Sequence, residues 1–202
     1  MKSQQDKSLI NVARTRPVTS GKKCLNKFQF LHEYMENREI SGYIQLFKPE
    51  SCVFVVSIDE NNKPNGMVAG WNMRCSSNPA LLAVSLSKKG NTQRLIKQNK
   101  EFVIAVPNKD LEEALLIFGS KHGDEVDKFK ETKLETQKAR VIKVPIIKDA
   151  TLNFECKLYK EVEAGDHIIF IGKVVHAHHN KNKKVLLNFG KDEKDNRIFK
   201  EF

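Results

Sequence analysis

A short polar segment, SKKGNT at residues 87–92, brings together groups that bind phosphate. It follows an apolar run typical of a strand and precedes a run with helical spacing. Asn91 or Thr92 is suited to cap that helix, because a short polar side chain can accept a hydrogen bond from the first turn. The N–H groups of a helix start, its dipole, a hydroxyl and an ammonium together favour a phosphate monoester. Similar segments also begin surface helices that bind nothing, so both interpretations stay open.

Small residues fill the stretch from residue 65 to residue 78, where a buried core would need large ones. Gly66, Gly70 and neighbouring alanine and serine residues carry little or no side chain. A strand edge or loop of such residues lets a flat ring approach the backbone and bond to its N–H and C=O groups. Trp71, the one tryptophan of the chain, could stack on such a ring or pack into the core.

Three histidines in the segment VVHAHHN raise the question of a metal ion. On a strand, His176 and His178 point to the same face, which is a geometry that metal ligands use. No acidic or cysteine residue lies beside them in the sequence, and the NKNKK that follows is typical of an exposed turn. The sequence therefore predicts no metal site.

The charge of the chain is compatible with nucleic acid but does not favour it. The formal net charge is +10 over 202 residues, and 30% of the residues are charged. The lysines are spread along the chain with aspartate and glutamate among them, and arginine, which bidentate base contacts favour, is scarce. We do not expect nucleic-acid binding to be the function. The length fits one domain with an extension.

The cysteines and the apolar runs indicate which cellular compartment the sequence favours. Cys24, Cys52, Cys75 and Cys156 form no C-x-x-C pair and suggest no disulfide framework, which fits a reducing compartment. No apolar run reaches transmembrane length, and the first 20 residues lack the apolar core of a secretory signal. We expect a cytoplasmic protein without a membrane partner. The basic N-terminal stretch would also be compatible with an organelle-targeting peptide.

The apolar patterns predict a mainly β domain. Runs typical of strands lie at residues 52–58, 80–86, 101–107, 154–162, 167–177 and 184–190, and the last is expected to close the sheet. The segment DENNKPNG after the first run predicts a hairpin turn. Short strands with few helices favour a barrel over a parallel sheet.

Helices are predicted in three places. The apolar spacing from Phe28 to Ile40 fits an amphipathic helix. A second helix is expected from residue 91, and a third from near Asp110 to a glycine cap at Gly119. We divide the chain into an N-terminal extension with a helix, residues 1–40, and a main domain, residues 41–202.

Five segments in register resemble the flavin reductase-like family, the FMN-binding split barrels that include the flavoredoxins. They are PNGMVAGW, SSNPALLAVSL, KKGNT, FGSKHGDEVDKF and GDHIIFIGKV, and their order matches the family over about residues 42–190. The chain departs from the pattern at Ala80, where a second proline is common, and at Phe118, where a cysteine is common. The resemblance implies a split β-barrel with short peripheral helices and a homodimer with FMN near the subunit interface.

The resemblance also implies the cofactor site by position. The implied cofactor-binding residues are Asn65, Trp71, Asn72, Cys75, Ser76, Ser87, Lys88, Thr92, Lys128 and His167. Ser87, Lys88 and Thr92 correspond to the phosphate site, and Asn65 and Trp71 correspond to the flavin ring. His167 is the implied catalytic residue, placed beside the ring where a nicotinamide would dock. From the residues alone, a solvated Lys128 and a strand-end hydrogen bond at His167 are the alternatives.

Together these observations predict an NAD(P)H-dependent flavin reductase that passes hydride from nicotinamide to flavin N5. The cofactor carries this chemistry, so the protein needs to supply binding, orientation and charge near the ring. An alternative is an FMN-containing electron carrier that takes electrons from a redox protein partner and has no pyridine nucleotide site. The basic surface would suit an acidic partner of that kind.

Overall fold

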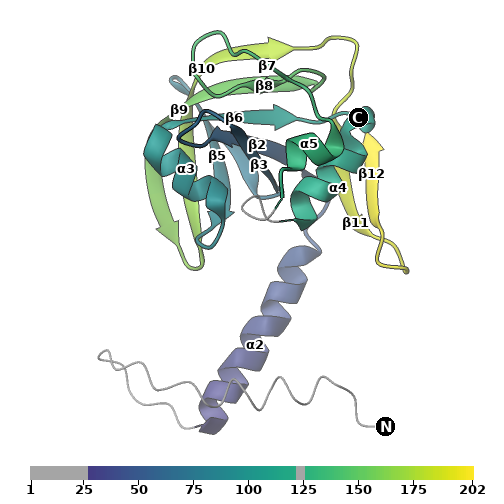
Figure 1. The fold of residues 1–202 in the computed structure, drawn as a ribbon. Coiled ribbons are helices and arrows are strands. Elements are labelled where there is room, and N and C mark those ends of the chain that lie inside the picture. The colour runs from purple at the N-terminus through teal and green to yellow at the C-terminus, as the bar shows by residue number, and fades with distance from the viewer. Residues whose placement is uncertain (1–26, 122–125) are drawn as a thin grey trace. The chain divides into compact units, whose positions relative to one another are not determined.

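The computed structural model describes residues 27–121 and 126–202, and it divides the chain into two units, residues 1–45 and 46–202 (Figure 1). The N-terminal arm, Cys24, and residues 122–125 of the segment FGSKHGDEVDKF lie outside the described residues. Helix α2 (Lys27–Gln45) belongs to the first unit and contains the stretch where the sequence predicts a helix. Among the described residues, no helix combines the length and apolar character needed to cross a membrane.

The second unit consists mainly of strands, as predicted. In chain order they are β1 (Glu50–Ser51), β2 (Val53–Ile58), β3 (Pro64–Ala69), β4 (Asn72–Ser77), β5 (Ala80–Ser87), β6 (Glu101–Val106), β7 (Thr136–Gln137), β8 (Ile146–Ile147), β9 (Leu152–Ala164), β10 (His167–His179), β11 (Leu186–Lys191) and β12 (Arg197–Glu201). The helical elements are α3 (Asn91–Asn99), η1 (Lys109–Leu111), α4 (Glu112–Ser120) and α5 (Lys128–Thr132).

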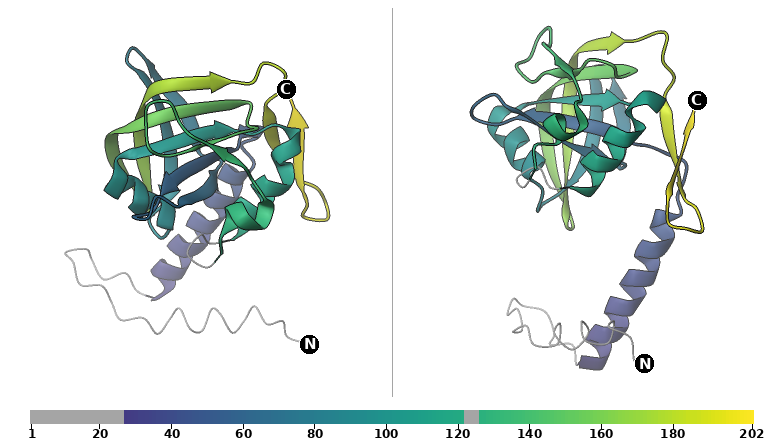
Figure 2. Two further views of the ribbon diagram at one scale, coloured as in Figure 1. Left: turned by 45° about the horizontal axis from the view of Figure 1, so that its top comes forward. Right: turned by 45° about the vertical axis from the view of Figure 1, so that its right-hand side comes forward.

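The main sheet has seven strands in the order β3-β2-β6-β9-β10-β5-β4, and all neighbours are antiparallel. The sheet curls so that edge strand β3 also contacts β5, although no ladder joins these two strands in the described part of the chain (Figure 2). The helices α3, α4 and α5 lie around this curled sheet. The result is an open barrel with short peripheral helices, and it confirms the predicted fold class.

The strand predicted to close the sheet does not do so. Instead, β11 pairs with β1 and with the C-terminal strand β12 in a separate three-stranded sheet. The sequence of β12, RIFKE, is too polar and too short to be recognised as a strand, yet its backbone takes the hydrogen bonds of β11. The prediction was therefore wrong about the partner of this strand, because pairing depends on a segment without a clear pattern.

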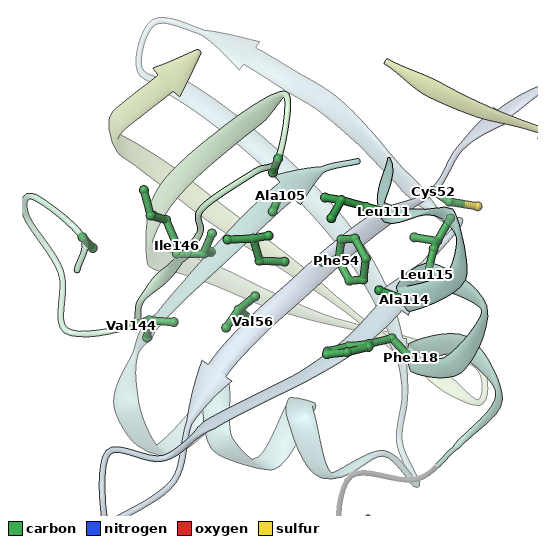
Figure 3. Close-up of a cluster of buried hydrophobic side chains, with 14 of the residues drawn as sticks. Cys52, Phe54, Val56, Ala105, Leu111, Ala114, Leu115, Phe118, Val144 and Ile146 are labelled. Carbon is green, nitrogen blue, oxygen red and sulfur yellow. The ribbon is translucent and has the colours of Figure 1, made fainter. Parts of the chain in front are cut away.

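Strand β2 is buried on both faces, which explains its continuous apolar sequence. Phe54 and Val56 pack with Phe118 of α4 in one cluster (Figure 3), in which the two phenylalanine rings meet edge to face. Val53 and Val55 point into a second cluster on the opposite face of the strand. Strand β2 therefore lies between the two hydrophobic clusters and contributes side chains to both.

A glycine interrupts β10 because the sheet leaves no room for a side chain there. A Cβ atom on Gly172 would lie 2.5 Å from Cζ of Phe102 and 2.8 Å from Cβ of Cys156. The pairing of β10 with β9 also shifts register between Ile171 and Gly172. Close approach of two buried side chains, rather than a turn, therefore accounts for this glycine.

Two helix ends differ from the sequence predictions. Helix α3 is capped by Gly90 in an extended conformation, so Asn91 and Thr92 lie inside the helix instead of capping it. Helix α4 continues through Gly119 to Ser120, and its C-cap is Lys121 in an extended conformation. The α4 helix packs its apolar face on the core through Ala114, Leu115 and Phe118, and it ends two residues after the last of them.

Candidate functional site

Strand β3 and helix α3 are joined by a hydrogen bond between two predicted site residues. The Oγ1 atom of Thr92 donates to Oδ1 of Asn65 at 3.1 Å, and the Thr92 residue is 3% exposed. The backbone oxygen of Asn65 accepts a hydrogen bond from the hydroxyl of Ser57. The contact from Thr92 orients the Asn65 side chain, and the contact from Ser57 holds its backbone. Thr92 therefore contacts Asn65 from the interior, and the phosphate role that the resemblance implies for Thr92 stays a prediction.

The turn between β5 and α3 uses two of its own N–H groups for contacts with Ser87, so an anion would bind the N–H groups of the first turn of α3, which have no acceptor within the helix. The backbone N–H of Gly90 donates to the carbonyl of Ser87 at 3.1 Å, and that of Lys89 donates to the Ser87 hydroxyl at 3.3 Å. Gly90 supplies no side-chain cap to the first turn of α3. Amide N–H groups at a helix start, together with the helix dipole, favour a phosphate group. The chemistry of this turn therefore fits the phosphate of FMN.

The ammonium of Lys88 lies at the same turn and is paired with a carboxylate. Its Nζ is 3.0 Å from Oε2 of Glu163, and both side chains are exposed. The hydrogen bond from Lys88 holds the pKa of Glu163 below its ordinary value. An exposed ion pair of this kind contributes little to stability. Lys88 can therefore exchange Glu163 for a bound phosphate at low cost.

The rings of Trp71 and His167 lie side by side, next to Ser87 of the same turn. Their ring centroids are 4.7 Å apart with an angle of 41° between the planes, and Trp71 is 46% exposed. His167 lies opposite Ser87 in the ladder between β10 and β5. The backbone carbonyl of Trp71 accepts a hydrogen bond from the N–H of Ser85. Three segments far apart in the sequence thus bring Trp71, Ser87 and His167 together.

The ring of His167 is oriented by the residue before it. Its Nδ1 lies 2.6 Å from Oδ1 of Asp166, and this hydrogen bond lowers the pKa of the Asp166 carboxyl group. An ionised carboxylate can only accept, so Nδ1 carries the hydrogen of this contact. Nε2 is then the ring nitrogen that is not used in the contact with Asp166. The GDH motif contains Asp166, but the sequence does not indicate that its carboxylate bonds to the ring of the next residue.

Lys128 is buried and connects β3 to α4. It is 5% exposed, and its Nζ donates to the backbone oxygens of Gly66 at 3.1 Å and of Phe118 at 2.9 Å. This position excludes the solvated helix end that the sequence left open. Lys128 and Asn65 line the same polar cavity of about 420 Å³ beside α3. The cavity also holds Asp127, whose pKa is lowered chiefly by its hydrogen bond with Lys63.

Three further predicted residues belong to strand β4 and lie elsewhere. Asn72, Cys75 and Ser76 line a mainly apolar cavity of about 1230 Å³. The amide of Asn72 donates to the backbone oxygens of Ser51 at 2.8 Å and of Gly70 at 3.1 Å. Its Oδ1 accepts from the Ser51 hydroxyl at 2.7 Å. The Asn72 side chain therefore holds the corner between β3 and β4.

The cysteines show different environments. Cys75 is exposed, at the register shift between Arg74 and Ser76. Burial, aided by the charge of Glu50, raises the pKa of Cys52 to about 11, and burial raises that of Cys156 to about 12. Thiols with such pKa values are protonated at neutral pH and are poor nucleophiles. The two buried cysteines are therefore packing residues.

Comparisons with known proteins converge on one kind of domain. The model of the flavin reductase like domain matches residues 49–195. An uncharacterised protein of Archaeoglobus fulgidus is 36% identical over 141 residues, which cover 70% of this chain and 78% of the relative. A ferric-chelate reductase (NAD(P)H) of the same organism is 28% identical over 142 residues, 69% of this chain and 82% of the relative.

A solved structure shows the same fold. The FMN-binding protein of Thermus thermophilus with bound p-hydroxybenzaldehyde superposes with a TM-score of 0.68 at 22% identity, covering 92% of this chain and 95% of that chain. At this level of identity the likeness concerns the fold alone.

Proposed function

The chain belongs to the flavin reductase-like family, and on that premise we propose that it binds FMN and reduces flavin with NADH or NADPH. The family match supports an oxidoreductase. The single observation that carries the finer proposal is the meeting of Trp71, Ser87 and His167, from three separate segments, beside the start of α3. An aromatic stack next to a phosphate-binding turn suits a ligand with a flat ring at one end and a phosphate at the other.

The residues have distinct roles in this proposal. Ser87, Lys88 and the first N–H groups of α3 hold the phosphate, for the reasons of charge and dipole given above. Asn65 and Trp71 border the ring. The chemistry that bound FMN would supply is acceptance of a hydride at N5 from the nicotinamide. Lys128 contributes a buried positive charge near Asn65, which favours negative charge on a reduced ring.

His167 is the proposed catalytic residue. Asp166 accepts from Nδ1 and so fixes the ring plane, while Trp71 packs against the face of the imidazole. With the hydrogen on Nδ1, the Nε2 atom accepts a hydrogen bond from a group docked beside the ring when the imidazole is neutral, and donates one when the imidazole is protonated.

The proposal is tested by a flavin titration and a turnover assay on the purified full-length protein. We expect FMN fluorescence to be quenched on binding and NADH or NADPH to be oxidised in the presence of FMN. His167→Ala should lower turnover more than it lowers FMN affinity, whereas His179→Ala, at an exposed histidine, should change neither. Absence of FMN binding would refute the proposal. FMN binding without oxidation of either nucleotide would instead support the electron carrier that accepts electrons from a protein partner.

Thr92→Val should weaken the binding of FMN and riboflavin equally. The substitution keeps the volume of the side chain but removes the hydroxyl that donates to Asn65. Asn65 is proposed at the ring, which both flavins share, so both should lose affinity by roughly two- to tenfold, the value of one neutral hydrogen bond. Fluorescence titrations with the two flavins measure this change.

Lys88→Met is the matched contrast to the threonine variant. It should weaken FMN alone, and the loss should shrink at high salt because the side chain is exposed. If Thr92→Val affects FMN and spares riboflavin, then Thr92 contacts the phosphate and its support of Asn65 is irrelevant to binding.

We also propose that the protein is a homodimer. Strand β4 is an edge of the main sheet, and Met73 on it is 60% exposed beside the large apolar cavity. An edge strand next to an apolar hollow is a surface that a second chain can cover. Sedimentation of the FMN-loaded protein should give twice the monomer mass. A single monomeric species at micromolar concentration would contradict this assignment.

A further inference from the structure

The hairpin of β9 and β10 gathers two imidazoles and a carboxylate on one face. Glu155 lies directly opposite His176 in the antiparallel ladder, and His178 follows two residues along β10. Side chains at these positions share a face of the sheet. The candidate ligand atoms of Glu155, His176 and His178 all lie within 4.8 Å of one another. No other cluster with at least three histidine, cysteine or acidic side chains this close occurs within the described residues.

The geometry inside the cluster is already compact. The Nε2 atom of His178 is 2.7 Å from Oε1 of Glu155, and the two imidazole rings meet edge to face at 4.7 Å. Both histidines are partly exposed, while Glu155 is fully buried. The carboxylate therefore forms the floor of the cluster, and the open side faces solvent.

The carboxylate is oriented by a second layer of contacts. Its Oε2 accepts from the backbone N–H groups of Val141 at 2.7 Å and Ile142 at 3.1 Å, and its Oε1 accepts from the N–H of Arg140 at 2.7 Å. Hydrogen bonds of this kind hold metal-binding carboxylates in place.

We propose that Glu155, His176 and His178 form a binding site for a divalent transition metal ion of the zinc class. Two histidines and one carboxylate are a ligand set that zinc accepts, with a fourth position for water on the open side. Zinc bonds of about 2.0–2.1 Å in a tetrahedron separate ligand atoms by roughly 3.3 Å. His178 must therefore withdraw slightly and His176 must turn inward, and both partly exposed side chains have the freedom to do so.

The site is independent of the proposed flavin site. The residues assigned to the flavin lie on other parts of the fold, at the start of β10 and around α3, whereas His176 and His178 lie at the opposite end of β10. The simpler interpretation is a hydrogen bond between Glu155 and His178 with no metal function. The two interpretations differ in one measurable respect, since His176 matters only if a metal binds.

The test is a metal titration of the full-length protein, produced without a histidine tag and stripped with a chelator. We expect one equivalent of ZnCl₂ to bind by calorimetry, and CoCl₂ to give visible absorption bands of a low-coordinate site. Loss of a residue that hydrogen-bonds to a metal ligand typically lowers metal affinity by about 10- to 100-fold. Loss of a direct ligand in His176→Ala should therefore lower zinc affinity by at least about 100-fold. His179→Ala removes an imidazole from the neighbouring exposed position and should leave zinc affinity unchanged.

Several results would overturn the assignment. Absence of zinc binding at micromolar concentration would leave only the hydrogen bond. Equal binding by the wild type and His176→Ala, or loss of binding in His179→Ala, would place the metal elsewhere. His176 is chosen because Glu155 also binds the backbone N–H groups of residues 140–142, and circular dichroism of each variant checks that the fold is kept. FMN affinity should be the same in the wild type and His176→Ala, so this test does not depend on the flavin proposal.

Discussion

Glu155→Gln should lower the free energy of unfolding by about 3 kcal/mol. The carboxylate is fully buried and accepts hydrogen bonds from His178 and from three backbone N–H groups. A glutamine can accept with only one of its two terminal atoms, so its NH₂ group must face at least one buried N–H donor. Weakened charged hydrogen bonds and an unsatisfied donor each cost about 1–3 kcal/mol. At this chain length the melting temperature should fall by roughly 6–12 °C.

Urea unfolding in buffer with a chelator measures this effect without interference from metal ions. The matched control is Glu161→Gln on the same strand, where the carboxylate makes only surface ion pairs with Lys97 and Lys100, each at 3.5 Å. That variant should lose about 0–1 kcal/mol. Similar losses in the two variants would show that burial and the backbone contacts of Glu155 are not important for stability.

The effect of Glu155 should also depend on pH. Burial acts to raise its pKa, but the hydrogen bonds from His178 and the backbone outweigh burial and hold the pKa below the ordinary value of 4.5. A group whose pKa is lowered by folding stabilises the fold above its unfolded pKa and loses this contribution as the pH falls. The difference between wild type and Glu155→Gln should therefore be complete at neutral pH and shrink below about pH 4.5.

Gly172→Ala should destabilise the protein by about 3 kcal/mol through a steric clash. The added methyl group would lie 2.5 Å from Cζ of Phe102 and 2.8 Å from Cβ of Cys156, and both residues are fully buried. Overpacking a core costs about 1–3 kcal/mol, and here the upper end is expected because Cys156 Cβ sits next to the backbone and cannot swing away. Thermal unfolding should show the loss.

A second substitution can test whether the clash is the cause. Phe102→Leu removes the ring atom nearest to the new methyl group, so the double variant should be less destabilised than the sum of the two single variants. Gly119→Ala is the control, because its Cβ would meet only Val68 at 3.8 Å, an ordinary contact. It should be neutral or slightly stabilising in helix α4. Additive losses in the double variant would argue against the clash.

The part of the fold that could be predicted is the part with strong apolar patterns. Strands β2, β5, β6, β9 and β10 carry branched and aromatic residues at strand spacing, and all were expected. Strands β3 and β4 have the sequences PNGMVA and NMRCSS, which are small or polar. They were expected only as a strand edge or loop, because their pairing comes from neighbouring strands rather than from their own side chains.

The candidate sites also contain a part that the sequence can indicate and a part that it cannot. The start of α3 and the Trp71 region could be proposed because the residues of each are adjacent in the sequence, and their role in flavin binding stays a prediction. The bond between Thr92 and Asn65 joins residues 27 positions apart, and the contact of Glu155 with His178 joins residues 23 positions apart. The histidines suggested a metal but showed no acidic neighbour in the sequence, since β9 supplies that neighbour only after the sheet has formed. Periodicity carries no information about such cross-strand partners.

Strands β2 and β6 each contribute side chains to both buried clusters. In β6, Val103 and Ala105 belong to the cluster with Phe118, while Phe102 and Ile104 belong to the other. If β2 and β6 move out of one cluster, their side chains are also withdrawn from the other, so the two clusters lose their packing together. Residues 46–202 should consequently behave as one cooperative folding unit, without a stable half. Glu155 bonds to the backbone beside the cluster that contains Phe118, whereas Gly172 contacts Phe102 and Cys156 of the other cluster. Each substitution should nevertheless lower the midpoint of one and the same unfolding transition.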